Sequence, residues 1–556
     1  MLITGAVRDI HGGPIAGAIV TGLGAGGRPI ASTTTDADGT FALDSAVTPV
    51  AVRIACAYCR AKTVTVASNE PIVAVIERYD AVLQPGVSAA DLAALPYGRI
   101  ENALALQPFW VLRTQPPIAA ALYPALSDRG LGRGSLVVDG GAPAYDFGSS
   151  TMTGLAVVPA HAGDDVRFVP SSQAYRYGTY GSGGAVEFSR DQTILEQAAY
   201  GDAGSLRFSA GTPQAGITLG TDADDVAQRS RLSASAQQGL AGGVFSAGIT
   251  AARATFATPE VDTSQSTASI AYARSFDRVQ LRLDAADAFG TSSIPLVPSL
   301  DNVWNNALLR GTLGTRIGIV DVDGSASYVN SLAQQPSGSV HYNQRNFTLE
   351  GHLPGPTAVD AAVAQTYITI YDGRNLDVTL PSLLVSQRLG AFGVGIGFSR
   401  SLLATYGEPE FVPATLAEAH LDYGDGHRLR GELQAYRRTS DTQAPLAGTG
   451  ISVAYQVTPT TTLRAWTLRV WGDMLQFAGP AVVAQPYVSG DTLWLTHQNG
   501  GFRLDAIYRR ASDGLQNRRG LDGDVYFPVT RRLAVGLRSE LAPEGRRSSV
   551  LLSVRP

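Results

Sequence analysis

The fold is decided by residues 100–191, whose pattern differs from everything that follows. They contain GSLVVDGGAP at 134–143, DVRFVP at 165–170 and YGTYGSGGAVEF at 177–188. Short apolar runs separated by glycine-rich turns are typical of a compact unit of mixed structure. From about Thr193 onward the chain becomes a long series of short alternating strands. A compact unit therefore precedes a sheet that is much larger than one ordinary core requires.

Three segments of this downstream series show its period of two most clearly: residues 278–284, 428–435 and 502–509. In the last segment the two faces are Phe502, Leu504, Ala506 and Tyr508 against Arg503, Asp505 and Arg509. A soluble sandwich would turn the polar face to bulk water, whereas a membrane barrel would turn it to the lumen and the apolar face to lipid. Repetition favours the barrel, because a single soluble core does not need about twenty such strands.

The number of strands follows from their spacing. About 22 segments fit between Thr193 and Pro556, with roughly 16 to 17 residues for each strand and its connection. A tilted membrane strand takes about 9 to 11 residues, which leaves about six for each connection. The connections alternate in length, with short ones at 277–278, 424–426, 459–461, 500–501 and 530–531, and longer ones at 290–302, 332–339, 407–414, 442–450 and 477–490. Outer-membrane barrels have short periplasmic turns and longer extracellular loops, so the sequence predicts a roughly 22-stranded antiparallel transmembrane β-barrel.

Residues 1–80 are interpreted as a small β-sandwich. They contain GGPIAGAIV at 12–20 and TDADGTF at 35–41, with an Asp-Gly turn between alternating strands. This pattern resembles the carboxypeptidase regulatory-like domain, which implies an Ig-like β-sandwich. Asp36 and Asp38 could suggest a calcium loop, but no glutamate closes one, so turn chemistry is the better interpretation.

Composition excludes several classes of protein. The 556 residues carry a net charge of -5 without a basic run, which argues against nucleic acid as a partner. No apolar run is long enough for a membrane-spanning helix. The two cysteines, Cys56 and Cys59, lack the further ligands of a zinc site, so a buried or loop-stapling pair is favoured over redox catalysis, and its disulfide state stays open. No secretory signal follows Met1, so we expect a truncated gene start or a processed form.

The segment 100–191 also resembles the plug domain of a known family, the TonB-dependent outer-membrane receptors. The family has a helix that ends before a Leu-x-Pro-Gly-like break, matched by 104–108 with Phe109 where glycine is usual. A Val-x-Val-Asp-Gly-x-Pro strand is matched by 136–143 with one extra glycine. The most specific family block is well kept only in its second half. The matching signature residues are Asp139, Gly140, Pro143, Tyr177, Gly178, Gly183 and Gly184.

The resemblance implies a mainly β architecture in four parts: an Ig-like sandwich at 1–80, a linker at 81–99, an α+β plug at 100–191, and a barrel at 192–556 that surrounds the plug. It also implies a monomer in the bacterial outer membrane that contacts lipid, a small or medium-sized extracellular ligand and a TonB-type energising complex. No cofactor or metal is implied. A TonB box is not identifiable, because the candidate at residues 70–75 reads equally well as the last sandwich strand.

The leading functional hypothesis is TonB-dependent import of a scarce, bulky nutrient, such as a siderophore, a cobalamin-like chelate or a glycan. The alternative is a surface-exposed structural or adhesion protein of the same architecture. An enzyme is not expected, because no nucleophile constellation is present. Candidate ligand contacts in the plug are Tyr145, Asp146 and His161. Five aromatic residues could bind a sugar ring, but a girdle at the membrane interface is the favoured interpretation of them: Trp466, Trp471, Tyr487, Trp494 and Tyr508.

Overall fold

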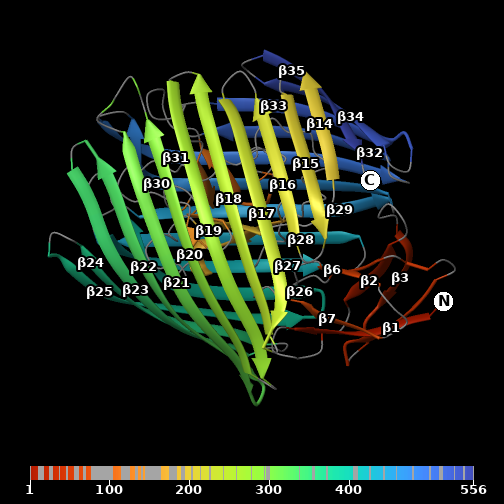
Figure 1. The fold of residues 1–556 in the computed structure, drawn as a ribbon, viewed down its shortest axis with the longest axis horizontal. Helices are drawn as coiled ribbons and strands as arrows, with labels where there is room; N and C mark the ends of the chain where they lie inside the picture. The colour runs from red at the N-terminus through yellow and green to blue at the C-terminus, as the bar shows by residue number, and fades with distance from the viewer. Residues whose placement is uncertain are drawn as a thin grey trace.

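A computed structural model shows a small sandwich, a group of short strands and a large barrel (Figure 1). The structure describes residues 2–76 with gaps, the segments 104, 106–113, 125–129, 131, 136–139, 142–143, 165–173 and 184–189, and most of residues 195–554. Among these residues, no helix has the length and hydropathy needed to cross a bilayer.

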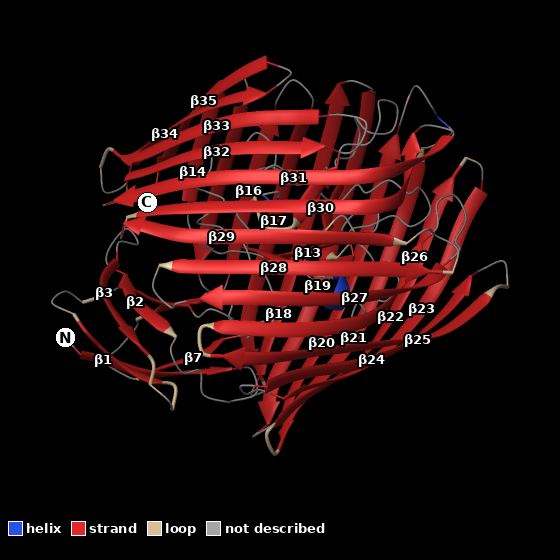
Figure 2. Cartoon of the chain, turned by 180° about the vertical axis from the view of Figure 1, so that it is seen from behind, coloured by secondary structure: helices blue, strands red, loops and turns tan. Residues whose placement is uncertain are grey.

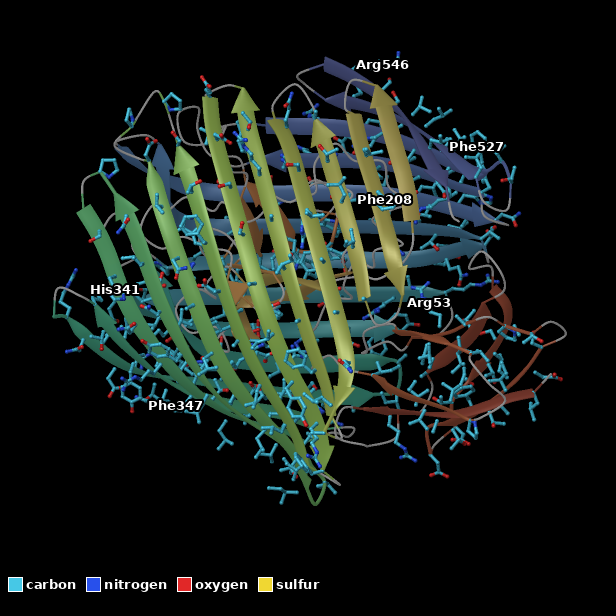
Figure 3. All side chains as sticks on the ribbon, in the orientation of Figure 1. Arg53, Phe208, His341, Phe347, Phe527 and Arg546 are labelled. Atoms are coloured by element: carbon cyan, nitrogen blue, oxygen red, sulfur yellow. The ribbon has the colours of Figure 1, made fainter. Side chains whose placement is uncertain are left out.

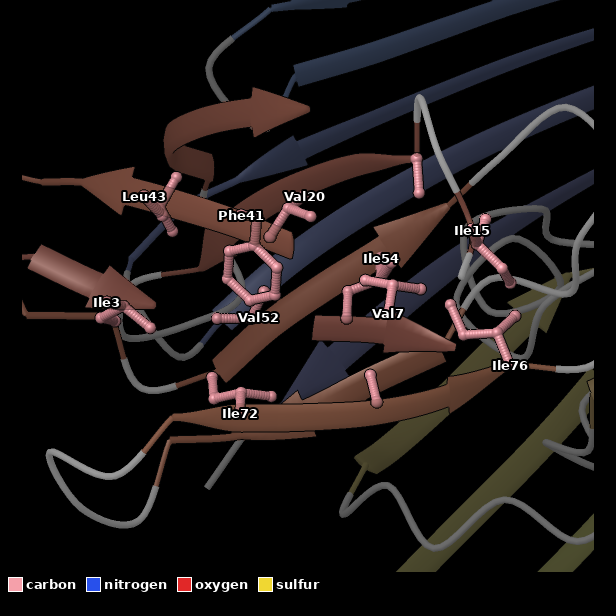
Figure 4. Packing of buried hydrophobic residues seen from close by; sticks show 12 residues of the cluster. Ile3, Val7, Ile15, Val20, Phe41, Leu43, Val52, Ile54, Ile72 and Ile76 are labelled. Carbon is pink, nitrogen blue, oxygen red and sulfur yellow. The ribbon is translucent and has the colours of Figure 1, made fainter. Parts of the chain in front are cut away.

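The N-terminal strands form two sheets that face each other. The strands are β1 (Leu2–Asp9), β2 (Ile19–Leu23), β3 (Pro29–Thr34), β4 (Thr40–Asp44), β5 (Ala51–Ala55), β6 (Lys62–Thr65) and β7 (Ile72–Ile76). One sheet has the order β4-β1-β7 and the other β3-β2-β5-β6. Apolar side chains from both sheets meet in one core, in which Phe41 and Leu43 of β4 face Val20 and Val52 of the other sheet (Figure 4). The described N-terminal strands therefore form two packed sheets with a common core.

Strand β7 decides between the two interpretations of residues 70–75. It pairs in parallel with β1, and Ile72, Ala74 and Ile76 are buried in the sandwich core. A segment recruited by a partner must be able to leave its own domain, whereas this one supplies part of the core. The segment from Ile72 to Ile76 is therefore the last strand of the sandwich, and the structure favours this interpretation over a TonB box.

Between the sandwich and the barrel, six short strands form two further sheets. They are β8 (Trp110–Arg113), β9 (Ala125–Asp128), β10 (Leu136–Asp139), β11 (Ala142–Pro143), β12 (Asp165–Val169) and β13 (Ala185–Ser189). Strands β8 and β9 form a hairpin, and the other four have the order β11-β10-β13-β12. We call the described part of residues 104–189 the plug segments. Figures 1 and 2 show them between the front and rear walls of the barrel.

The remaining strands, β14 to β35, close into one barrel of 22 strands, the number that the spacing predicts. Their bounds are β14 (Leu195–Gly201), β15 (Gly204–Thr212), β16 (Ala215–Ala223), β17 (Ala227–Leu240), β18 (Gly243–Ala257), β19 (Glu260–Phe276), β20 (Val279–Ser293), β21 (Asn302–Ile317), β22 (Val320–Gln335), β23 (Gly338–Leu353), β24 (Thr357–Ile370), β25 (Asn375–Leu389), β26 (Phe392–Ala404), β27 (Phe411–Gly424), β28 (Leu429–Ser440), β29 (Leu446–Thr458), β30 (Thr461–Ala478), β31 (Ala481–Asn499), β32 (Phe502–Ser512), β33 (Asn517–Pro528), β34 (Leu533–Ala542) and β35 (Gly545–Val554). All neighbours are antiparallel, and β14 pairs with β35 to close the ring.

The two ends of the barrel differ in their connections. Odd-numbered strands run toward the end beside the N-terminal sandwich, as the arrowhead of β27 shows in Figure 2. We call this the domain end and the opposite one the far end. Connections at the domain end have two to four residues, whereas those at the far end have two to eight. All five connections predicted to be short lie at the domain end, and all five predicted to be longer lie at the far end.

Two of the predicted longer connections are wrong in length. Strand β22 continues to Gln335 and β23 begins at Gly338, while β30 continues to Ala478 and β31 begins at Ala481. Only two residues separate the strands in each case, and Pro336, at the first of these connections, is a turn residue and not the middle of a longer loop. The division into about ten strand residues and six connection residues is wrong for the same reason, since β31 alone has 19 residues.

The outer wall is apolar, and the buried face of the strands points inward. Phe208 and Phe347 project away from the ribbon (Figure 3), and both side chains are more than 40% exposed. On β32, Ala506 and Tyr508 are exposed, while Asp505 is buried. The face assignment predicted for this strand is confirmed, and the apolar outer face is the one that suits lipid.

Candidate functional site

Strands β10 and β13, which are far apart in the chain, lie side by side. Strand β10 pairs in parallel with β13, with Leu136 opposite Ala185. Asp139 pairs with Ala142, so β10 and β11 are antiparallel neighbours. Gly184 enters β13 with a φ of 82°, in the left-handed region that only glycine adopts without strain. Gly184 therefore suits the backbone conformation at the start of β13.

Most of the other predicted site residues fall outside the described part of the chain. Asp139 and Pro143 are placed by their backbone in β10 and β11. The remaining predicted residues lie outside the described residues: Gly140, Tyr177, Gly178, Gly183, Tyr145, Asp146, His161, Cys56 and Cys59. Their predicted functions stay predictions.

The plug segments contact the barrel wall first through Phe109. Its side chain is fully buried in a cluster with residues of β27 to β30, including Leu416 and Trp466. Gly450 makes the space for it, because a Cβ at that position would lie 2.5 Å from the phenyl ring. Phe109 has a φ of 68°, so it occupies a left-handed position at the point where the family pattern has glycine.

Arg129 provides an ionic contact beside this cluster. Its backbone N–H donates to the Phe109 carbonyl at 2.7 Å, and its guanidinium donates to the Glu418 carboxylate at 2.5 Å. Both charged side chains are buried, with 3% and 6% of their surface exposed. The Tyr436 hydroxyl donates to the Arg129 carbonyl, and the Arg129 guanidinium lies 5.2 Å from the Tyr436 ring centre. A buried pair with these additional bonds fixes the hairpin β8–β9 to the wall at one orientation.

A second contact lies on another part of the wall. Val169 of β12 and Ala185 of β13 share a buried cluster with Tyr342, Ile368 and other side chains of β23 to β26. The Ser382 hydroxyl donates to the Ser172 carbonyl at 3.3 Å. The plug segments are thus held at two adjacent parts of the wall, β27 to β30 and β23 to β26.

Two sectors of the wall differ in the chemistry of their buried polar side chains. On β19 to β24 they are hydroxyls and amides, namely Thr263, Gln265, Thr267, Ser292, Asn306, Ser331, Gln344, Asn346, Thr348 and Thr366, together with Asp284 and Asp321 near the domain end. On β31 to β34 they are mainly charged. There the Arg503 guanidinium lies 2.6 Å from the Asp505 carboxylate, which also accepts from Trp494 Nε1 at 2.7 Å.

The predicted aromatic girdle is wrong for two of its members. Trp466 and Trp494 are buried on the inner face, whereas Trp471 and Tyr508 are exposed on the outer face. Tyr487 is placed in β31, but nothing is described of its side chain. The inward pair follows from strand parity, which a count of aromatic residues ignores.

Sequence reasoning missed the residues that join plug segments to wall, above all Arg129, Glu418 and Tyr436. They are separated by about 290 to 307 residues in the chain, and a single sequence contains no signal for such a pairing. In the described residues, no group of three or more His, Cys, Asp or Glu side chains is arranged to hold a metal ion.

Comparison with known proteins identifies the fold. No family model matches the chain, and no curated protein matches its sequence. The siderophore receptor PirA from Pseudomonas aeruginosa matches with a TM-score of 0.67 at 13% identity, over 85% of this chain and 99% of that one. The alcaligin receptor FauA from Bordetella pertussis has a TM-score of 0.67 at 12% identity, over 89% and 98%. The copper transporter OprC has a TM-score of 0.65 at 10% identity, over 83% and 96%. The chain therefore has the fold of these outer-membrane proteins.

Proposed function

We propose that the chain is a TonB-dependent importer of the bacterial outer membrane, and not an enzyme. Its cargo is a scarce, bulky nutrient of the siderophore, cobalamin-like or glycan type. The observation that carries the proposal is the filled lumen, because a 22-stranded ring is too wide for its own side chains to close. The plug segments lie inside it and contact the wall from β23 to β30.

The outer face of the barrel supports a location in the outer membrane. Its outer face carries exposed leucine, isoleucine, valine and phenylalanine side chains on nearly every strand, which would be unfavourable in water and is favourable in lipid. A closed ring has no strand edge to leave unpaired in hydrocarbon. The copper and siderophore proteins with the same fold support the transport function.

The plug must move before a bulky cargo can pass, and its buried contacts make that movement costly. Breaking a buried ion pair such as Arg129–Glu418 costs about 3 to 5 kcal/mol. The outer membrane has no nucleotide supply, so the energy has to come from a partner that pulls from the periplasm. The family resemblance of residues 100–191 supplies that partner, a TonB-type complex.

The short connections at the far end favour import over adhesion. The longest has eight residues, at 294–301, and most have five or fewer. An adhesin presents broad surfaces outside the cell, and connections of this length offer little area for a macromolecular partner.

The test is uptake by cells that express the chain with and without an intact TonB complex. The probes are a labelled ferric catecholate, cobalamin and a panel of neutral oligosaccharides. We expect at least one probe to accumulate only when the complex is intact. Heat-modifiable migration on gels serves as the control that the barrel is folded in both strains. Surface display without energised uptake of any probe would instead support the structural or adhesion function.

A further inference from the structure

Within the described residues, one sector of the wall combines a long connection with a contact to the plug segments. The longest connection of the barrel, 294–301, joins β20 to β21 at the far end. Plug strand β11, which contains the signature residue Pro143, lies against these same two strands. The part of the plug that matches the family pattern and the largest far-end loop therefore meet at one place on the circumference.

The inner face of β20 is unusually flat in this sector. Ala286, Ala288 and Gly290 follow one another on the buried face. Trp304 of β21 is buried beside them, and its indole covers Gly290, since a Cβ on that glycine would lie 2.2 Å from the ring. Gly290 is three residues from the end of β20, about 10 Å below the far rim.

Two polar atoms in this row have no hydrogen-bond partner. Gln265, Gly290 and Trp304 are neighbours across three strands, so the glutamine and the tryptophan flank the glycine about 10 Å apart by backbone. Gln265 Oε1 and Trp304 Nε1 are both buried and unpaired. Leaving a buried donor or acceptor without a partner is costly, and such groups are kept where something else satisfies them.

The chemistry around these atoms is neutral. The buried neighbours are the hydroxyls of Thr267, Ser292 and Ser331 and the amide of Asn306. Deeper in the wall, Asp284 is neutralised by Arg282 at 2.8 Å and Arg310 at 3.4 Å. The nearest cation in the same row is Arg231, two strands from Gln265, and it already takes part in other interactions.

We propose that this sector lines the passage of the cargo and binds a neutral, hydroxyl-rich ligand of the glycan class once β11 has moved away. A hydroxyl can accept from Trp304 Nε1 and donate to Gln265 Oε1, and the apolar face of a sugar ring packs on an indole. The track of small residues gives room for a ring to slide past. This inference rests on the proposed import function and specifies its cargo.

The test compares energised uptake of labelled maltohexaose, a wider panel of neutral oligosaccharides and an anionic ferric catecholate in cells with four variants. Trp304→Phe removes the indole N–H and keeps a ring, and Gln265→Leu removes the acceptor. Gln434→Leu is the matched control for Gln265→Leu, since it deletes another buried amide with an unpaired Oε1 on β28, a distant part of the wall. Arg231→Gln reports on an anionic cargo. Heat modifiability confirms folding of each variant.

We expect a KM for neutral oligosaccharide that is about five- to tenfold higher in Trp304→Phe and Gln265→Leu, and unchanged in Gln434→Leu. Energised uptake of the ferric catecholate alone, sensitive to Arg231→Gln, would overturn the glycan assignment while leaving the import function intact. Equal effects of Gln265→Leu and Gln434→Leu would overturn the sector assignment. Loss of energised uptake for every probe would count against the import function itself.

Discussion

At the plug–wall contact, two residues other than glycine have left-handed backbones: Phe109 at φ 68° and Arg129 at φ 50°. A left-handed conformation costs about 1 to 2 kcal/mol for such residues. The cost is offset because Phe109 buries its whole side chain and Arg129 forms the ion pair with Glu418. The sequence identified position 109 as unusual, since glycine is expected there. It contained no indication of what the phenyl ring contacts.

We expect Phe109→Gly to destabilise the folded protein by about 2 kcal/mol. Removing a buried phenyl costs about 3 to 5 kcal/mol, and relief of the backbone strain returns about 1 to 2 kcal/mol. The measurement is the urea midpoint of heat-modifiable migration in detergent. Phe109→Leu keeps most of the burial and all of the strain, so its stability should lie between that of the wild type and that of Phe109→Gly. A glycine variant more stable than the wild type would show that strain, and not packing, dominates here.

In the N-terminal sandwich, Asp36 confirms the turn interpretation over the calcium loop. Its carboxylate accepts from the backbone N–H groups of Asp38 and Thr40, at 3.1 and 2.8 Å, and from the Thr40 hydroxyl at 2.6 Å. Both oxygens are therefore engaged within the turn that precedes β4. The Thr40 hydroxyl bond, followed by the Thr40 and Asp38 backbone bonds, holds the pKa of Asp36 below its usual value.

The lowered pKa of Asp36 makes the stability of this turn depend on pH. Because the folded-state pKa of Asp36 is lowered, its stabilisation is complete above the unfolded pKa of about 3.9 and is lost as the pH falls through the folded value. We expect protection of β4 from hydrogen exchange to decline below about pH 4 in the full chain. Asp36→Asn should have weaker protection at neutral pH and lose this acid dependence, whereas Asp38→Asn should behave as wild type. An unchanged acid profile in Asp36→Asn would assign the dependence to another group.

At the scale of elements, the faces of strands were predictable and the ends of strands were not. A period of two is a local property, so the inward Asp505 and the outward Tyr508 follow from the sequence alone. Strand ends depend on how far the ring continues beyond the membrane. Pro336 therefore marks a two-residue turn where the sequence suggests a loop. The inward Asp505 is also more constrained than its sequence shows, since it accepts from Trp494, Thr496 and Arg503.

The outward face of β32 provides a test of the lipid environment. Ala506→Arg places a charge near the middle of this strand on the outer face, where it should cost about 2 to 4 kcal/mol at the bilayer midplane. Ala506→Leu at the same position should be tolerated. The measurement is refolding into lipid vesicles, followed by urea titration. If arginine and leucine are equally tolerated, the outer face meets water and the membrane assignment of this strand fails.

At the scale of the whole molecule, the strand number and the order of parts were accessible from sequence, because repetition along the chain reports on a closed ring. The contacts between plug segments and wall were not accessible. Arg129 and Glu418 are 289 residues apart, and their pairing depends on how the ring closes around the hairpin. The chemical division of the lumen was missed for the same reason, since it appears only when strand parity is combined with position on the circumference.

The Arg129–Glu418 pair should stabilise the folded protein more than a surface pair on the same barrel does. We expect Glu418→Ala to lower the free energy of unfolding by about 3 to 5 kcal/mol, because it leaves Arg129 buried without its carboxylate. Arg253→Ala breaks an exposed pair with Asp262 and should cost much less, because solvent screens that pair. Urea titration measures both, and Arg129→Ala together with the Arg129→Ala/Glu418→Ala double variant completes a double-mutant cycle. A coupling energy near zero would show that the pair does not stabilise the plug–wall contact.

The seam between β14 and β35 imposes an order on biogenesis. Glu196 pairs with Val554, so the first strand of the ring finds its second neighbour only when the last strand has been made. Until then both strands present open edges, which would recruit other chains if they were not shielded. The segments that end up inside precede β14 in the chain, and once the seam has formed they are encircled. Loss of β35 alone would thus leave an unclosed sheet and free the contents of the lumen, although every residue of the plug segments would be intact.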